Sequence, residues 1–350
     1  MCGKYIYGII SRINQATWDI LGVDGSNPVY TITYQDLSCI VSDYFSEKFS
    51  AKSKEEVIKN LLTHQMVVER VMKKHTVLPV KFGTVLATSD EVQELLSGGR
   101  QQFVDALDWI HDKVEVEVAA TWDPRQVLQE ICKEEEVLRI WRAMASNTEQ
   151  QILEGRIRLG QMVKAFMDRR RDSYREQMIS FLKPVTVDVH PNTLIAEEMV
   201  MNVAFLVEKA NQEEFDSRVR QLNDLFHNQI DFRIIGPLPP YSFATVEVTR
   251  LDPKKIEEAR QLLGLSENIS EAEVRGAYRH LAAEIHPDRR PGDGTAMVQF
   301  AKLRHALNLL IAYCRSQTKS GGSLLINIRR LKDEDLHFLE TGSIAGVTDG

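Results

Sequence analysis

The sequence predicts an α+β protein: two units of strands and covering helices with long helices between them, followed by an all-helical bundle. Three observations support this class. Short β-branched and aromatic runs stand beside separate helical runs in residues 1–123, and the same mixture returns in residues 124–250 after a stretch of long helices. Residues 251–316 have helical spacing almost throughout, ahead of a tail at residues 317–350.

The first unit, residues 1–123, contains five strand-like runs and two helical runs. The helical runs are residues 53–74 and residues 89–112, and Gly98-Gly99 interrupts the second. Strands that are segregated from two covering helices indicate a ferredoxin-like α+β sandwich. The strand-like runs are KYIYGII (4–10), VYTITYQ (29–35), LSCIVSDY (37–44), VLPVKFGTVL (77–86) and, as the closing strand, VEVEVAAT (114–121).

The helix predicted at residues 53–74 carries an apolar stripe. Residues at steps of three and four share one face of a helix, so we expect this stripe to pack on the sheet. The stripe consists of Val57, Leu61, Leu62, Val68 and Val71.

Residues 124–250 form the second α+β unit, which begins with a helical hairpin. Apolar residues recur at steps close to three or four up to about Leu182, which predicts long helices. The chain then returns to strand-like runs around a helix at residues 211–228. The runs are VTVDVH (185–190), VMNVAFLVE (200–208) and DFRIIGPLPPYSFATVEV (231–248).

The third unit, residues 251–316, is short and helical. One helix ends near Gly264, and the next begins at Ser270, which matches a capping box with Glu273. Pro287 ends that helix, and a further helix follows a Gly/Pro-rich loop.

The last segment, residues 317–350, has tail composition. It begins QTKSGGS and ends TGSIAGVTDG. Its single apolar stretch, LLINI (324–328), is able to dock on the body of the protein.

Composition and charge limit the classes of function. A chain of 350 residues with a net charge of −7 argues against a dedicated nucleic-acid binder, and aspartates flank the basic run at residues 169–171 as on a solvated helix face. No apolar run approaches the ~20 residues of a membrane span, and the N-terminus has no signal-peptide pattern. We therefore expect a cytoplasmic protein with no nucleic-acid partner and no membrane partner.

No arrangement of residues is typical of catalysis. The four cysteines have no CxxC spacing, and SGGR (97–100) and PGDG (291–294) lack the Lys-Ser/Thr of a phosphate loop. We therefore predict that the protein is not an enzyme and has no catalytic residue, metal or cofactor. Five histidines stand outside any ligand pattern and are expected to be surface or satisfied core residues: His64, His75, His111, His190 and His227.

Two proline-containing stretches are more specific. Pro79 removes a backbone donor from its strand, which suits a sheet edge or a bulge. GPLPPYSF (236–243), the proline corner, is a rigid turn that presents Tyr241 and Phe243 at its exit. The corner is either a sharp bend between sheet and loop or a pre-shaped docking surface, and the residues favour neither alternative.

Four blocks occur in a recognisable order: YIYGII (5–10), LPVKFGTVL (78–86), NVAFLVEK (202–209) and IIGPLPPYSF (234–243). Together they resemble the gas vesicle F/L family (GvpF/GvpL) over about residues 4–250. The resemblance implies two ferredoxin-like parts and an accessory or minor protein of gas vesicle formation. Such a protein helps the small hydrophobic shell protein to assemble, and its partners are the shell protein and other gas vesicle proteins. It implies no catalytic residues.

The helical unit resembles a J domain, the module with which DnaJ-type proteins activate a DnaK-type chaperone. The His-Pro-Asp tripeptide, the AYRHLA sequence and the loop length agree together. By this resemblance, His286, Pro287 and Asp288 contact the chaperone, and Arg275 and Arg279 on the preceding helix add electrostatic attraction.

The sequence departs from the J-domain pattern in one respect. Members usually carry several lysines just before His-Pro-Asp, whereas this chain has Ala282, Ala283 and Glu284. Electrostatic steering is therefore weaker. The alternative is a degenerate bundle that is kept for packing, with His-Pro-Asp as a helix stop.

These observations lead to three functional hypotheses. The first is a gas vesicle assembly factor that binds the shell protein, with Tyr241 and Phe243 as docking residues, and brings a DnaK-type chaperone to it. The second is a minor structural component of the vesicle with a vestigial J domain. The third is a general co-chaperone that is unrelated to vesicles, which the four ordered blocks disfavour. The first two place the protein at the gas vesicle.

Overall fold

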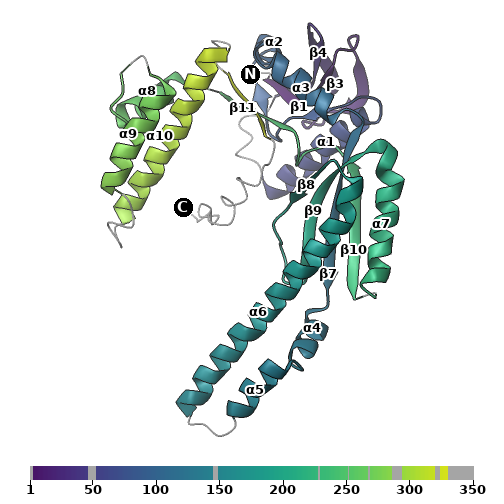
Figure 1. The fold of residues 1–350 in the computed structure, drawn as a ribbon. Coiled ribbons are helices and arrows are strands. Elements are labelled where there is room, and N and C mark those ends of the chain that lie inside the picture. The colour runs from purple at the N-terminus through teal and green to yellow at the C-terminus, as the bar shows by residue number, and fades with distance from the viewer. Residues whose placement is uncertain are drawn as a thin grey trace. The chain divides into compact units, whose positions relative to one another are not determined.

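The computed structural model describes residues 3–45, 53–144, 149–227, 229–250, 252–266, 269–285, 294–319 and 324–329 (Figure 1). These residues form two compact units. Unit 1 contains described residues of 3–109 and 244–329, and unit 2 contains those of 110–243. Antiparallel sheets, long helices and a C-terminal helical region confirm the predicted α+β class.

The main sheet of unit 1 is built around strand β1. β1 pairs antiparallel with β4 on one side and with β5 and β6 on the other, and β3 and β2 continue beyond β4. β1 is buried over almost its whole length, in agreement with its unbroken apolar and aromatic run. The strands are β1 (Gly3–Ser11), β2 (Thr17–Leu21), β3 (Pro28–Tyr34), β4 (Leu37–Tyr44), β5 (Leu78–Pro79) and β6 (Val85–Leu86).

The single strand predicted at residues 77–86 is wrong, because β5 and β6 are two short strands with a turn between them. Gly83 has φ +83°, a conformation that favours glycine, and its N–H donates to the Tyr5 hydroxyl at 3.1 Å. Thr84 N–H donates to the Lys81 carbonyl and closes the turn. The internal glycine therefore marks a chain reversal within the LPVKFGTVL block.

Three helices belong to the N-terminal part of unit 1. α1 (Lys54–Met72) begins with a capping box formed by Ser53 and Glu56. α2 (Ser89–Gly98) and α3 (Arg100–Ile110) confirm that the glycine pair interrupts the predicted helix. A side chain at Gly99 would place its Cβ 2.4 Å from the Phe103 ring, so this break admits only glycine without rearrangement.

The buried face of α1 differs from the predicted stripe. Val68 and Val71 are buried as expected, but Leu61 and Leu62 are exposed. The buried face also includes two polar residues, Asn60 and His64, which the periodicity of apolar residues cannot identify. α1 therefore has a second apolar face that points to solvent.

Unit 1 also contains a two-stranded antiparallel sheet made of β11 (Thr245–Arg250) and β12 (Leu324–Arg329). A parallel bridge between Val80 and Val246 joins β11 to the N-terminal part. One prediction is corrected here, because β11 leaves the second α+β unit for unit 1. The apolar stretch LLINI docks on unit 1 as expected, and it does so as the paired strand β12. Both depend on pairing between segments that are distant in sequence.

The sheet of unit 2 has the order β10-β7-β9-β8, with all neighbours antiparallel. β7 does not close the first unit as predicted, because its pairing partners β9 and β10 both belong to unit 2. An alternating pattern predicts a strand but does not identify its neighbours. The strands are β7 (Lys113–Trp122), β8 (Asp188–Pro191), β9 (Met199–Glu208) and β10 (Ile230–Leu238).

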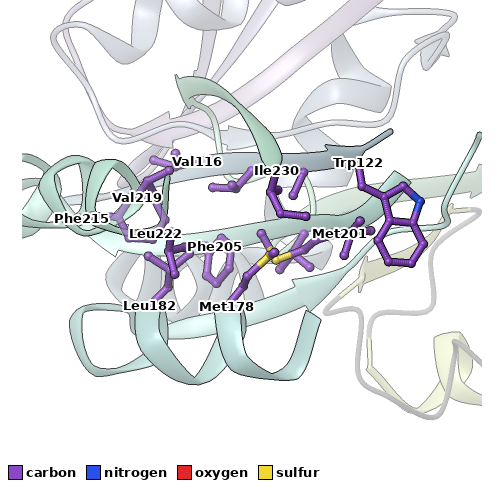
Figure 2. Close-up of a cluster of buried hydrophobic side chains, with 14 of the residues drawn as sticks. Val116, Trp122, Met178, Leu182, Met201, Phe205, Phe215, Val219, Leu222 and Ile230 are labelled. Carbon is purple, nitrogen blue, oxygen red and sulfur yellow. The ribbon is translucent and has the colours of Figure 1, made fainter. Parts of the chain in front are cut away.

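The helices of unit 2 confirm the predicted hairpin and its following helix. α6 and α7 pack apolar side chains on one face of the sheet, and Figure 2 shows Met178 and Leu182 of α6 near Phe205 of β9. Aromatic rings of Phe205 and Phe215 lie 5.3 Å apart within this core. The helices are α4 (Pro124–Ile131), α5 (Glu135–Met144), α6 (Glu149–Leu182) and α7 (Gln212–Leu225), with short 3-10 turns at Lys183–Val185 and Lys209–Asn211.

The C-terminal helices form a bundle with its own apolar core. Ser270 and Glu273 cap the second helix as predicted, because the Glu273 N–H donates to the Ser270 hydroxyl and the Ser270 N–H to the Glu273 carboxylate. Val274, Leu303 and Leu310 are central to the core. The helices are α8 (Pro253–Leu262), α9 (Glu271–Ile285) and α10 (Gly294–Lys319).

Candidate functional site

The described residues contain no cluster of side chains that is typical of a metal site. In the described ranges, no group of three or more His, Cys, Asp or Glu side chains is placed so that it could hold a metal ion. His64 is a core residue: its Nδ1 shares a hydrogen bond of 3.0 Å with the Tyr5 hydroxyl, and burial lowers its pKa to about 4. Across the described helices, none combines the length and the apolar character needed to cross a membrane.

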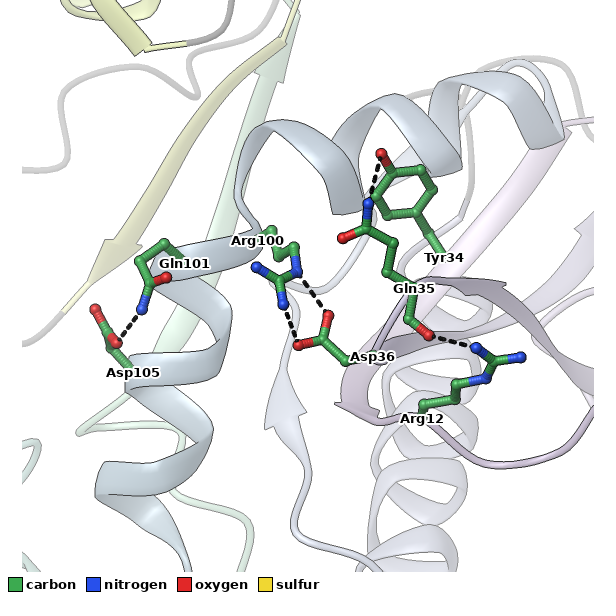
Figure 3. Close-up of polar contacts among 7 residues, drawn as sticks. All are labelled: Arg12, Tyr34, Gln35, Asp36, Arg100, Gln101 and Asp105. Carbon is green, nitrogen blue, oxygen red and sulfur yellow. Dashed lines mark hydrogen bonds and ion pairs between the residues drawn. The ribbon is translucent and has the colours of Figure 1, made fainter.

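The SGGR segment has a structural role in unit 1. Arg100, the first residue of α3, donates from Nε and Nη2 to the two carboxylate oxygens of Asp36 at 2.7 and 2.6 Å (Figure 3). This pair holds the pKa of Asp36 below its usual range. Arg12 donates to the Gln35 carbonyl on the same turn between β3 and β4. The Arg100–Asp36 ion pair therefore links the start of α3 to the turn between β3 and β4.

The proline corner, residues 236–243, begins within an irregularity in the pairing of β10 with β7, between Ile235 and Leu238. The Gly236-Pro237 peptide bond is cis, and Gly236 has φ +151°. A Cβ on Gly236 would lie 3.1 Å from the Glu115 carbonyl oxygen, so the corner packs tightly on β7. The structure buries Phe243, which is 3% exposed, whereas Tyr241 is partly exposed.

A buried carboxylate holds the proline corner. Glu115 of β7 is 1% exposed and accepts hydrogen bonds from the Ser242 N–H at 2.8 Å and from the Ser242 hydroxyl at 2.7 Å. Because side chains alternate along a strand, Glu115 lies on the opposite face of the sheet from Val114 and Val116 of the core. Sequence analysis missed Glu115, since its partner is 127 positions away.

The environment of Glu115 changes its acidity. Burial raises the pKa of its carboxyl group to about 7, although both hydrogen bonds from Ser242 favour the ionised form, and the charge of Glu117 adds to the increase. The carboxyl group therefore titrates near neutral pH while it holds the corner.

Replacing Glu115 by glutamine is expected to remove a pH-dependent part of the stability. The folded-state pKa lies above the ordinary value of 4.5, so the stabilisation by Glu115 is complete below pH 4.5 and is lost as the pH rises through about 7. The shift corresponds to roughly 3 kcal/mol. Glutamine has the same shape and no proton to lose. Denaturant unfolding from about pH 4.5 to pH 8 should therefore show a smaller fall in the free energy of unfolding for the variant.

The matched control is Glu208→Gln, because Glu208 is an exposed glutamate on β9 of the same sheet. It should leave the pH dependence of wild type unchanged. If the free energy of unfolding has the same pH dependence in wild type and in Glu115→Gln, the pKa of Glu115 is not raised in the folded protein.

The outward face of α1 is an exposed apolar surface, which we call the α1 apolar face. Its four residues recur at helical spacing, and part of it borders a shallow hollow of about 450 Å³. Glu55, Lys59 and Thr63 form the polar part of the lining of this hollow. The face consists of Ile58, Leu61, Leu62 and Met66.

The structure places the two predicted chaperone-binding arginines one turn apart on α9. Both are exposed. Arg275 donates to the Glu271 carboxylate at 2.7 Å, which neutralises part of its charge, whereas Arg279 donates from Nε to the Arg275 carbonyl oxygen. His286, Pro287 and Asp288 lie outside the described residues, directly after the end of α9.

Two family models match the chain in separate segments. The model described as gas vesicle synthesis protein GvpL/GvpF matches residues 3–245, and the DnaJ domain model matches residues 260–315. The first match contains the main sheet of unit 1, the sheet of unit 2 and the proline corner. The second contains most of the helical bundle, with α9 and the His-Pro-Asp tripeptide.

Curated relatives and a solved structure agree with the first match. The chain is 26% identical over 248 residues to gas vesicle protein F of Dolichospermum flosaquae, covering 69% of this chain and 98% of the relative. It is 28% identical to gas vesicle protein F of Streptomyces sp. (strain CB03234), covering 68% and 98%. The crystal structure of GvpF from Anabaena sp. PCC7120 superposes with a TM-score of 0.62 at 25% identity, covering 69% of this chain and 98% of that one.

Proposed function

Because this chain belongs to the gas vesicle synthesis protein GvpL/GvpF family, we propose that it assists vesicle formation by binding the hydrophobic shell protein. The family is not a known enzyme family. Because the chain is a member, it has a gas vesicle-associated role. We further propose that the J domain recruits a DnaK-type chaperone to the bound shell protein, at the growing vesicle in the cytoplasm. The combination of both family matches in one chain supports it.

The physical need for such a protein follows from the nature of a shell subunit. A subunit with a strongly apolar face exposes that face before assembly, and exposed apolar surfaces aggregate. A binding protein that covers this face keeps the subunit available for assembly. A chaperone recruited to the same complex acts on the subunit when it is released.

The α1 apolar face suits an apolar partner. Its four large apolar residues gather on one helix, whose opposite face is already buried in unit 1. The proline corner offers less apolar surface, because Phe243 is buried. We therefore propose that the shell subunit docks on the α1 apolar face and that Tyr241 contributes at a second contact.

Replacing Leu62 by glutamate is expected to weaken capture of the shell protein about tenfold or more. Burial of a leucine side chain contributes ~1.5–3 kcal/mol, and 1.4 kcal/mol is a factor of ten in affinity. Leu62 is 60% exposed, so the change should alter the free energy of unfolding by less than about 0.5 kcal/mol. Co-purification of the shell protein with tagged variants measures capture.

The matched control is Leu225→Glu on α7, because Leu225 is 56% exposed and lies outside the α1 apolar face. This variant should capture the shell protein like wild type. If Leu62→Glu captures as much shell protein as the control, the shell subunit does not dock on α1.

A second candidate function is a minor structural component of the vesicle with a vestigial J domain. The pairing of Arg275 with Glu271 favours this candidate, because it reduces the positive charge with which α9 attracts a chaperone. The two functions differ in the fate of the protein. A structural component stays in finished vesicles in a fixed ratio to the shell protein, whereas an assembly factor leaves them.

A further inference from the structure

β10 is an edge strand of the unit 2 sheet. Among the described strands it pairs only with β7, so its second edge has no strand partner in the described part of the chain (Figure 1). β10 spans nine residues, whereas proteins often keep edge strands short to limit unwanted pairing. The backbone N–H and C=O groups of such an edge are able to pair with a further strand.

The side chains of β10 divide between the two faces of the sheet. Ile230 and Phe232 face the apolar core of unit 2, and Figure 2 shows Ile230 at this core. Because side chains alternate along a strand, Asp231 and Arg233 lie on the opposite face. Both are exposed, and neither forms an ion pair with another described residue. One face of β10 therefore presents two opposite charges, two positions apart, beside the unpaired edge.

These two charges select one register in which β10 can pair with β10 of a second copy. In a two-fold antiparallel pair, residue i meets residue j, j meets i, and opposite residues share one face of the sheet. A pair centred on Asp231 or on Arg233 places that residue opposite itself, and like charges directly opposite are destabilising. A pair centred on Phe232 places Asp231 of each copy opposite Arg233 of the other. In this register both charges of both copies gain a partner.

The remaining residues of β10 fit the register centred on Phe232. Ile230 of each copy lies opposite Ile234 of the other, and Ile234 is 40% exposed in the single chain. The pairing therefore covers apolar surface that is otherwise in contact with water. Pro237 has no N–H to donate, but it falls opposite residue 227, which precedes β10. The proline therefore lies outside the paired segment.

The alternative is that the charges of β10 protect its edge. Charged side chains on an edge strand often prevent association with another chain. A row of like charges repels a second copy in every register, whereas Asp231 and Arg233 attract it in the register centred on Phe232. The opposite signs therefore favour pairing over protection.

We propose that the unpaired edge of β10 is a homodimer interface, in which residues 230–234 of two copies pair antiparallel about Phe232. The two four-stranded sheets then form one continuous sheet. A single short strand pair buries less area than a standard protein interface, so the dimer is weak and forms with rising concentration. The interface does not depend on the proposed function, and its failure leaves shell-protein capture by a single chain untouched.

Charge reversal in the full chain tests the register. Asp231→Arg places arginine opposite arginine, and Arg233→Asp places aspartate opposite aspartate. Each variant is expected to raise the dissociation constant of the dimer about tenfold or more, because every dimer contains two altered pairs. An equimolar mixture of the two variants should dimerise like wild type, since each chain then supplies the charges that the other lacks. Sedimentation equilibrium over a concentration series measures the dissociation constants.

The matched control is Asp188→Arg, because Asp188 is an exposed aspartate on β8, at the other edge of the same sheet. It changes the net charge as Asp231→Arg does and should dimerise like wild type. The mixture distinguishes repulsion from misfolding, because mixing does not rescue an unfolded chain. A wild-type chain that stays monomeric at every concentration, single variants that dimerise like wild type, or a mixture that dimerises no better than its components would each overturn the proposal.

Discussion

Replacement of Phe243 by alanine is expected to lower the free energy of unfolding by ~3–5 kcal/mol, the usual cost of truncating a buried aromatic side chain. The phenyl ring is 3% exposed at the end of the proline corner, next to the fully buried Ala244. The loss of its packing leaves a cavity that the corner cannot easily close, because Glu115 holds the preceding residue, Ser242, by two hydrogen bonds. Denaturant unfolding measures the change.

Phe243→Leu is the control for this prediction, since it keeps most of the buried volume and should cost less than about 1.5 kcal/mol. The pair of variants also decides between the two alternatives for the corner. If Phe243→Ala keeps the stability of wild type and loses capture of the shell protein, the ring is a docking residue and not a packing residue. If both variants capture the shell protein when folded, the corner is a structural bend.

Replacement of His286 by glutamine is expected to abolish stimulation of a DnaK-type ATPase and to lower vesicle yield, without lowering the melting temperature. Among the described residues, the apolar core of the bundle is built from α8, α9 and α10, with Val274, Leu303 and Leu310 at its centre. An effect on stimulation without an effect on folding places His286 in contact with the chaperone. ATPase assays with the full chain and thermal unfolding measure the two properties.

His305→Gln is the matched control, because His305 is an exposed histidine on α10 of the same bundle. It should stimulate the ATPase like wild type. A companion variant, Arg279→Glu, should weaken stimulation more at low salt than at high salt, since exposed charges are screened over ~10 Å at 0.1 M ionic strength. Normal vesicle yield with His286→Gln, together with no stimulation by the wild-type chain, would make the bundle vestigial.

Local sequence determined the features that depend on near neighbours in the chain. The capping box of α9, the break at Gly99 and the helical hairpin of unit 2 were all predictable, because caps, glycine breaks and helical periodicity involve residues within a few positions of each other. The ordered blocks and the His-Pro-Asp tripeptide identified both family relationships in the same way.

Only the tertiary structure decided which strands are neighbours and which faces are buried. A strand pattern of period two is satisfied by any partner of suitable length, so the sequence could not place β7 in unit 2 or pair β12 with β11. The exposure of Leu62 and the burial of Glu115 have the same cause. Each depends on contacts with residues that are distant in the sequence. A local sequence pattern carries no information about the free energy of those contacts.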